Sequence, residues 1–209
     1  MRVPQTYAHG VRDGEAFVEM EHLALGGVPD WQAMARMLAQ LHRCTLDRFG
    51  WAQDNWIGLS PQKNGWCDDW TRFWIERRLQ PQLQLAEQKG FRFEEVNYSR
   101  ILEKHKPQPS LLHGDLWNGN AGFTAEGPVI FDPAVYYGDR EADLAMTELF
   151  GGFPKEFYAS YNEAFPLPSE YAVRKNLYNL YHLLNHLNLF GGGYLGQVKA
   201  TLGLVLQAL

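Results

Sequence analysis

Cysteine, cationic charge and long apolar runs are all scarce in this chain. Its 209 residues include two cysteines, Cys44 and Cys67, which argues against a disulfide framework and a structural zinc site. Lysine and arginine number 19 against 24 aspartate and glutamate, a net charge of −5, and no basic run exceeds Arg77-Arg78. We therefore expect no nucleic acid or membrane partner. No apolar segment opens the chain or approaches roughly 18 residues, which predicts a cytoplasmic protein.

Apolar and aromatic residues are plentiful. The chain is 45% hydrophobic and 14% aromatic, with 21% charged residues, well outside the range of disordered proteins. A chain of this length buries roughly 70% of its unfolded surface. We therefore expect one domain, or a large lobe with a small appendage.

The pattern of elements changes once along the chain. Short β-prone stretches at 3–7 and 16–20 flank the turn signal Arg12-Asp13-Gly14, which predicts a hairpin. From the predicted N-cap Asp30 onward, apolar residues recur at helical spacing. Helices are expected at 30–41, 69–89 (interrupted by Pro81), 94–105, 140–150, 154–164, 170–189 and 194–208, and a strand at 128–131. The predicted class is mainly α with a small β component (α+β).

A loop between the helical regions carries the clearest chemical motif. His113, Asp115 and Asn120 match H-x-D-x-x-x-x-N, in which the aspartate accepts a substrate hydroxyl proton and the asparagine holds a metal ion. Phosphoryl transfer needs such a fixed carboxylate together with oxygen ligands for magnesium. We predict Asp115 as the base and Asn120 as a ligand. A turn aspartate that bonds its own loop is the structural alternative for Asp115, and His113 is expected to brace the backbone.

Asp132 follows the predicted strand at 128–131 and is the expected second metal ligand. It stands where kinases carry the aspartate of D-F-G, although here the tripeptide is Asp132-Pro133-Ala134. A turn or helix cap is the alternative role. Asp143, farther along, is expected to brace the next helix or to hold the catalytic loop from behind.

Residues 17–23 are typical of a kinase hinge. In a hinge, an extended backbone offers a carbonyl and an N–H to the edge of adenine. This pattern predicts nucleotide contacts at Met20, Glu21 and Leu23. A strand that runs into a helix would have similar residues.

Across nearly its whole length, the chain resembles the fructosamine kinase (ketosamine 3-kinase) family, a branch of the aminoglycoside phosphotransferase and protein-kinase-like superfamily. The matching stretches are FG at 49–50, DNWIG at 54–58, PQKN at 61–64, DW at 69–70, HGDLW at 113–117 with GN at 119–120, GPVIFDPA at 127–134, YG at 137–138, EADLA at 141–145, LFGGF at 149–153 and LYHLLNH at 180–186.

The resemblance implies an ATP-dependent kinase that phosphorylates the 3-hydroxyl of ketosamines on glycated amines. Asp115 would be the base, and Asn120 and Asp132 would be the Mg²⁺ ligands. Trp117 would line the sugar-amine pocket, with Asn64 in the same aromatic and amide cluster. From the residues alone, a packing role is an equally good interpretation of Trp117.

One departure from the family pattern concerns the start of the chain. Family members carry a nucleotide-covering loop and a strand lysine upstream of the hinge, whereas the first lysine here is Lys63. We therefore expect a remnant small-lobe hairpin and hinge at 1–26 and a helical kinase lobe at 27–209. An exposed strand edge on the hairpin makes a second copy of the chain a candidate partner. A catalytically impaired protein that only binds, and an aminoglycoside- or choline-type phosphotransferase, are the alternatives.

Two other motifs are predicted to have no catalytic role. Residues 191–196 satisfy G-x-G-x-x-G but follow a long helix, so we expect a turn between helices. His182 and His186 have zinc-ligand spacing without a third ligand, which favours packing or substrate-side contacts.

Overall fold

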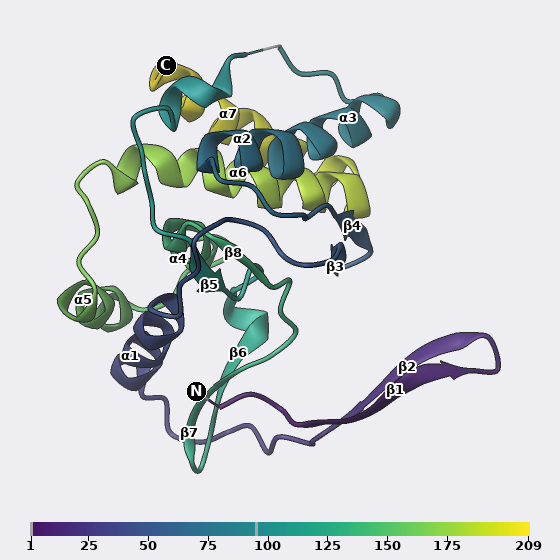
Figure 1. The fold of residues 1–209 in the computed structure, drawn as a ribbon, viewed down its shortest axis with the longest axis vertical. Coiled ribbons are helices and arrows are strands. Elements are labelled where there is room, and N and C mark those ends of the chain that lie inside the picture. Colours follow the sequence, from purple (N-terminus) through teal and green to yellow (C-terminus); the bar gives the residue numbers. More distant parts are fainter. Residues whose placement is uncertain (1, 95) are drawn as a thin grey trace.

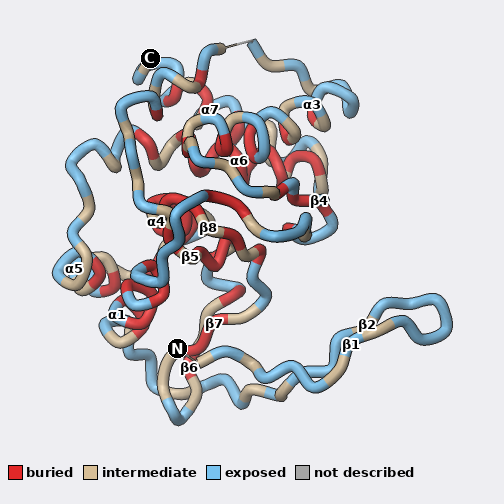
Figure 2. Tube along the Cα trace, viewed as in Figure 1, coloured by how far each residue is buried: buried red, intermediate tan, exposed pale blue. Residues whose placement is uncertain are grey.

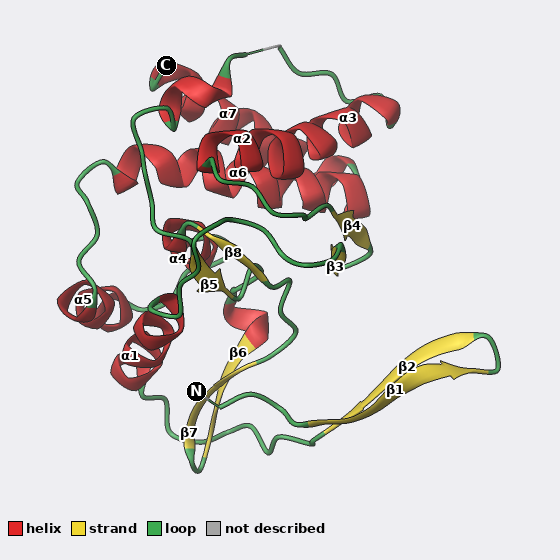
Figure 3. Cartoon of the chain, in the orientation of Figure 1, coloured by secondary structure: helices red, strands yellow, loops and turns green. Residues whose placement is uncertain are grey.

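The computed structural model describes residues 2–94 and 96–209, and most of its regular structure is helical (Figures 1 and 3). The α-helices are α1 (Trp31–His42), α2 (Trp70–Trp74), α3 (Gln80–Gln88), α4 (Arg140–Glu148), α5 (Lys155–Ala164), α6 (Tyr171–Phe190) and α7 (Leu195–Gln207). A π-helical turn covers Ile75–Leu79, and 3-10 turns cover Tyr98–Ile101, Asn118–Asn120 and Gly192–Tyr194.

The described strands pair in four small antiparallel sheets. They are β1 (Thr6–Arg12) with β2 (Glu15–Met20), β3 (Asn55–Ile57) with β4 (Ser60–Gln62), β5 (Ser110–Leu112) with β8 (Tyr136–Gly138), and β6 (Ala121–Thr124) with β7 (Gly127–Ile130). The predicted α+β class is confirmed. The sequence analysis predicted the first hairpin and the strand β7 but missed the other short strands.

The hairpin β1–β2 projects away from the rest of the chain (Figure 1). Asp13 and Gly14 form its turn with φ of 54° and 84°, the positive values that a two-residue hairpin turn requires. Val11 is 73% exposed and Val18 56% exposed. The predicted hairpin is confirmed, and it presents apolar side chains and free strand edges to solvent.

Self-association through this hairpin is the expected result of that exposure. We expect the chain to form dimers or larger species at high concentration, and the double substitution Val11→Lys, Val18→Lys to restore monomers, because charged edge residues oppose strand pairing. Sedimentation velocity over a concentration series measures the effect. Val28→Lys, at an exposed apolar residue outside the hairpin, is the matched control. A chain that stays monomeric at high concentration would contradict the prediction.

Most of the helices begin and end where the sequence indicates. The side chain of Asp30 accepts a hydrogen bond from the Ala33 N–H (2.8 Å) and caps α1.

The helix predicted at 94–105 is wrong apart from the 3-10 turn at Tyr98–Ile101; residue 95 lies outside the described residues. Ser99 Oγ donates to Asn97 Oδ1 (2.5 Å) there, and such local side-chain bonding is typical of residues that favour turns over helices.

Two hydrophobic cores lie on either side of the loop at 113–120. The first gathers α2, α3, α6 and α7, and the second gathers α1, α5 and the β6–β7 hairpin. The middle of α6, from Leu177 to Asn185, is buried throughout (Figure 2). Leu112 belongs to the first core and Leu116 to the second, so the loop between them is anchored at both ends. This double anchoring fixes the position of Asp115.

The glycine-rich segment at 191–196 forms the turn between α6 and α7, as predicted. None of the helices described is both long and apolar enough to cross a membrane.

Candidate active site

The loop residues predicted from the sequence lie together. Asn120 Nδ2 donates to the Asp115 carbonyl (2.8 Å) and lies 3.4 Å from Asp115 Oδ2 and 3.4 Å from the Asp132 carbonyl. Asn120 is buried, Asp115 is half-buried and the Asp132 side chain is exposed. One carboxamide therefore joins the loop at 113–120 to the turn that follows β7.

A buried aspartate holds the catalytic loop from behind, as the sequence analysis expected. The two oxygens of Asp143, on α4, accept hydrogen bonds from the backbone N–H groups of His113 (2.7 Å) and Gly114 (2.8 Å). His42 Nε2 lies 3.1 Å from Asp143 Oδ2, and His42 Nδ1 lies 2.7 Å from the Tyr161 hydroxyl. The sequence analysis missed His42. Its position on the apolar face of α1, four residues after Leu38, is the signal that could have identified it.

His113 braces the backbone, as predicted. Its Nε2 donates to the Phe131 carbonyl (2.9 Å), and its Nδ1 accepts from the Asp115 N–H (3.3 Å). Since a carbonyl only accepts and an N–H only donates, these partners fix the neutral Nε2–H tautomer. Burial lowers the pKa of His113, which also favours the neutral ring. The ring thus ties Asp115 to the residue before Asp132.

Gly114 allows the two loops to approach each other. It has φ of +82°, and a Cβ at this position would lie 2.1 Å from the Ala134 carbonyl oxygen. No other residue type fits this spacing and this backbone conformation. The glycine of the H-G-D motif is therefore required by the packing of the loop at 113–120 on the 132–135 turn.

The electrostatics of the site favour a cation. Burial raises the pKa of Asp115 to about 7, the charges of Asp132 and Asp143 add to the rise, and the Asn120 hydrogen bond opposes it. His182 Nδ1 lies 3.9 Å from Asp115 Oδ1, but burial lowers the pKa of His182 to about 3, so that ring is neutral. Among residues 2–94 and 96–209, no lysine or arginine lies within 4.0 Å of either the Asp115 or the Asp132 carboxylate. These negative groups and the Asn120 carboxamide fit a hard divalent cation.

The predicted substrate residues separate in space. Trp117 is 37% exposed beside the catalytic loop, with its ring 6.4 Å from Phe150. Asn64 is 2% exposed; its Oδ1 accepts from Arg78 Nη2 (2.8 Å), and its Nδ2 donates to the Gln53 carbonyl (3.1 Å) and to Asn55 Oδ1 (2.8 Å). With its amide used by protein partners, Asn64 is not available to a substrate. This corrects the predicted contact of Asn64 with a substrate.

The predicted hinge lies beside the β6–β7 hairpin. The N–H groups of Gly26 and Gly27 both donate to the Phe123 carbonyl (3.0 and 2.9 Å). The Glu21 N–H donates to the Gln5 carbonyl (2.7 Å). Within the described chain, the Glu21 carbonyl and the Leu23 N–H have no protein partner. Met20, at the end of β2, is exposed. The nucleotide contacts remain a prediction.

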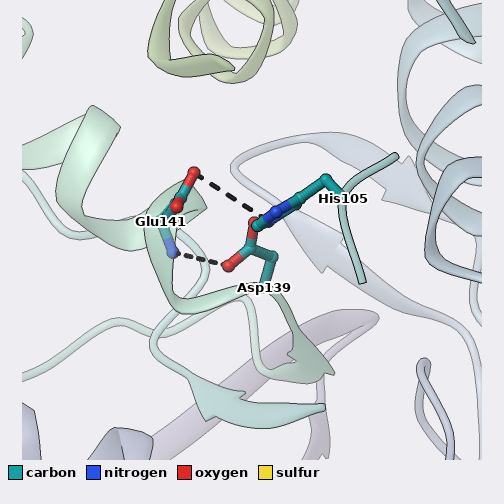
Figure 4. A group of neighbouring side chains, drawn as sticks. All are labelled: His105, Asp139 and Glu141. Carbon is teal, nitrogen blue, oxygen red and sulfur yellow. Dashed lines mark hydrogen bonds and ion pairs between the residues drawn. The ribbon is translucent and has the colours of Figure 1, made fainter. Parts of the chain in front are cut away.

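A second group of potential metal ligands is satisfied by the protein itself. His105 Nε2 lies 2.7 Å from Asp139 Oδ2 and 4.0 Å from Glu141 Oε2 (Figure 4). The guanidinium of Arg174 donates two bonds of 2.7 Å to Glu141, and the Tyr178 hydroxyl donates to Asp139 Oδ2 (2.6 Å). These donors occupy oxygens of both carboxylates. We interpret the group as a buried ion-pair network.

Comparison with known proteins identifies close relatives. A family model described as fructosamine kinase matches residues 1–208. A "Probable ketoamine kinase" from Synechocystis sp. is 47% identical over 211 residues, which cover 97% of this chain and 72% of the relative. A crystal structure from Haemophilus somnus that carries a fructosamine-3-kinase name has a TM-score of 0.91 at 35% identity, covering 100% of this chain and 74% of that chain.

A more distant structure, LicA in complex with AMP, has a TM-score of 0.54 at 12% identity and covers 98% of this chain and 73% of that chain. This likeness shows the fold alone.

Proposed function

Because the chain belongs to the fructosamine kinase family and has a protein-kinase-like fold, we propose that it transfers the γ-phosphoryl group of ATP to a sugar hydroxyl of ketosamines. The observation that carries the proposal is the position of Asn120, whose side chain touches both Asp115 and the Asp132 backbone. This contact assembles a carboxylate beside a cation-binding pair, the arrangement that phosphoryl transfer requires.

Asp115 is the proposed base. With a pKa of about 7, the carboxyl group is near the pH at which a general base works best, since it can both accept a proton and exist in its ionised form at neutral pH. Its position is fixed by the bond from its own N–H to His113 and by the Asn120 contact. The carboxylate would orient the sugar hydroxyl and accept its proton.

The proposed cation ligands are the Asn120 carboxamide oxygen and the Asp132 carboxylate. The Asn120 NH₂ group already donates to Asp115 and Asp132, which leaves its oxygen without a protein partner in the described residues. The Asp132 carboxylate likewise has none there. When bound, Mg²⁺ would neutralise charge on the transferring phosphates.

The proposed adenine site is the segment from Met20 to Leu23. Its unpartnered Glu21 carbonyl and Leu23 N–H offer the acceptor and donor that an adenine edge needs. The AMP complex of the distant neighbour LicA supports nucleotide binding by this fold. We also propose a domain boundary near residue 26, between this segment and the helical lobe.

The proposed sugar-amine pocket has an aromatic wall. Trp117 follows Asp115 by two residues, and its ring meets Phe150, which contacts His186 (4.5 Å) and Tyr194 (6.2 Å). Aromatic faces attract both the apolar side of a sugar and a protonated amine. A ketosamine carries both groups.

Phosphorylation of a substrate panel tests the proposal. We expect kcat/KM for fructosamine and ribulosamine derivatives of small amines to exceed the values for choline and for an aminoglycoside by at least about tenfold, because a pocket built for one polar acceptor discriminates against others. ADP release measured with a coupled assay, and mass spectrometry of the product, give the result.

The competing outcomes are distinct. Faster phosphorylation of choline or an aminoglycoside would assign the chain to a sister activity. Background turnover of every acceptor, with Mn²⁺·ATP binding retained, would instead favour a protein that only binds.

A further inference from the structure

Arg78 is a buried charge without a counter-ion. Its side chain is 0% exposed, and no carboxylate in the described parts of the chain lies within 4.0 Å of it. Its guanidinium lies 4.0 Å from the centre of the Tyr136 ring and 4.7 Å from that of Phe73. It donates to Asn64 Oδ1 (2.8 Å) and to the Lys63 carbonyl. Burying an unpaired charge is unfavourable, so the contacts of Arg78 need an explanation.

A π-helical turn presents this arginine to the interior. Residues Ile75–Leu79 interrupt the helix between α2 and α3, and Pro81 is the second residue after this turn. Pro81 has no N–H for the helical ladder, and Arg78 Nη1 donates instead to the Arg77 carbonyl (3.1 Å). Such π turns occur frequently at functional sites. The sequence predicted an interruption at Pro81, but not that it would place a cation in the core.

A chain of amides runs from Arg78 to the turn that carries Asp132. Asn64 Nδ2 donates to Asn55 Oδ1 (2.8 Å), and Asn55 Nδ2 donates to the Val135 carbonyl (2.8 Å). Gln62 Nε2 donates to Asn55 Oδ1 (2.9 Å) and to the Ala134 carbonyl (3.0 Å). An arginine only donates and a backbone carbonyl only accepts, so the two ends force the direction of every bond between them.

The turn needs support because its backbone is strained. Asp132 has φ of +56°, a conformation that residues other than glycine rarely adopt and that persists where the surroundings impose it. On one side of the turn, the Ala134 N–H donates to the His113 carbonyl (2.8 Å). On the other side, Gln62 and Asn55 hold the carbonyls of Ala134 and Val135. The turn is therefore fixed between the catalytic loop and the amide chain.

We propose that Arg78, Asn64, Asn55 and Gln62 form a positioning relay that sets the Asp132 carboxylate for divalent-cation binding. The inference rests on the proposed role of Asp132 as a cation ligand. Each relay residue acts through the 132–135 turn and touches no reacting atom. Partners that orient a ligand typically change metal affinity by about 10–100-fold when they are lost.

Asn64→Asp is the sharpest test of the relay. An aspartate there still accepts the hydrogen bond from Arg78 and supplies the missing counter-ion, so the fold is retained. The aspartate side chain cannot donate to Asn55 Oδ1. The hydrogen bond from Asn55 to the 132–135 turn is therefore reversed or broken. We expect the Kd for Mn²⁺, measured by electron paramagnetic resonance, to rise at least about tenfold, with the Tm at or above that of the unsubstituted chain. A role in stability alone predicts unchanged Mn²⁺ affinity.

Controls keep the test decisive. Lys63→Ala removes an exposed side chain that pairs with Asp54 and leaves the relay intact, so its Mn²⁺ affinity should not change. Gln62→Met removes the bond to Ala134 at similar volume and decides the question if Asn64→Asp does not fold. Mn²⁺ affinity within twofold of the unsubstituted value in the folded relay variants would overturn the proposal.

Hydrogen–deuterium exchange of residues 131–136 separates the relay from the proposed function, because it needs no cation. Faster exchange in Asn64→Asp and Gln62→Met, but not in Lys63→Ala, is expected. If the unsubstituted chain binds no Mn²⁺, the proposed cation role of Asp132 is wrong. Hydrogen–deuterium exchange then tests only whether the relay holds the 132–135 turn in place. Unchanged exchange in both relay variants would overturn it.

Discussion

Replacing Asp115 with asparagine is expected to lower kcat by about 10²- to 10⁴-fold, the usual contribution of a positioned base. Asparagine has nearly the same shape, and its carboxamide oxygen can still accept from Asn120 Nδ2, which lies 3.4 Å from Asp115 Oδ2. It cannot accept a proton from a sugar hydroxyl. Initial rates with the best acceptor of the ketosamine panel measure the loss.

The same substitution should leave the fold intact. Burial raises the pKa of Asp115 to about 7, above the unfolded value of about 3.9, so folding disfavours the ionised carboxylate. The cost to stability grows as the pH rises from the unfolded to the folded pKa. The neutral asparagine side chain removes this cost. We therefore expect the Tm of Asp115→Asn at pH 8 in cation-free buffer to equal or exceed that of the unsubstituted chain. Asp47→Asn, on an exposed aspartate, is the control. Near-normal turnover of the Asp115 variant would remove its role as the base.

Asp143→Ala is expected to destabilise the fold by about 3–5 kcal/mol, the usual cost of removing one partner of a buried charged network. The carboxylate is 1% exposed and accepts from His113 N–H, Gly114 N–H and the His42 ring. Alanine leaves these donors buried without an acceptor. Urea unfolding measures the difference, with Glu163→Ala, at an exposed position on α5, as the control.

The Asp143 effect should depend on pH. Burial raises the pKa of Asp143 and is the largest single influence, but the hydrogen bonds from His42 and from the Gly114 N–H oppose it, and the pKa is held below its usual value. The stabilisation is therefore complete above the unfolded pKa of about 3.9 and is lost as the pH falls through the folded pKa. The free energy of unfolding of Asp143→Ala should be compared with that of the unsubstituted chain. A difference below about 1 kcal/mol at pH 7, or a difference that grows as the pH falls, would contradict this role.

Local patterns predicted the hairpin and most of the helices, because the determining forces act between near neighbours. Asp13-Gly14 adopts the positive φ values of a tight turn, and Asp30 caps α1 through a residue three positions away. The same reasoning failed at 94–105, where side chains bond locally and only a 3-10 turn forms. It also missed short strands: β5 and β8 pair across a distant stretch of the chain, whereas β3–β4 and β6–β7 are local hairpins of three- and four-residue strands.

The spacing of residues in one loop predicted Asp115 and Asn120 as candidate site residues, and the end of a nearby strand predicted Asp132; the structure brings all three together. Position in sequence could not reveal which side of the fold a polar residue faces. Asn64 was expected at the substrate and lies in the interior, since the buried Arg78 requires an acceptor and donates to Asn64 Oδ1. His42 gains its importance from Asp143, which is separated from it by 101 residues.

Residue type and short spacing alone were enough to propose the chemistry of this protein, because the proposed base and the two proposed oxygen ligands lie close together in the chain. How those groups are held became visible only in the folded chain. His42, Asp143, Arg78 and Gln62 come from separate helices and strands, and their hydrogen bonds exist only once the two cores have packed. Long-range contacts of this kind leave no local pattern in the chain.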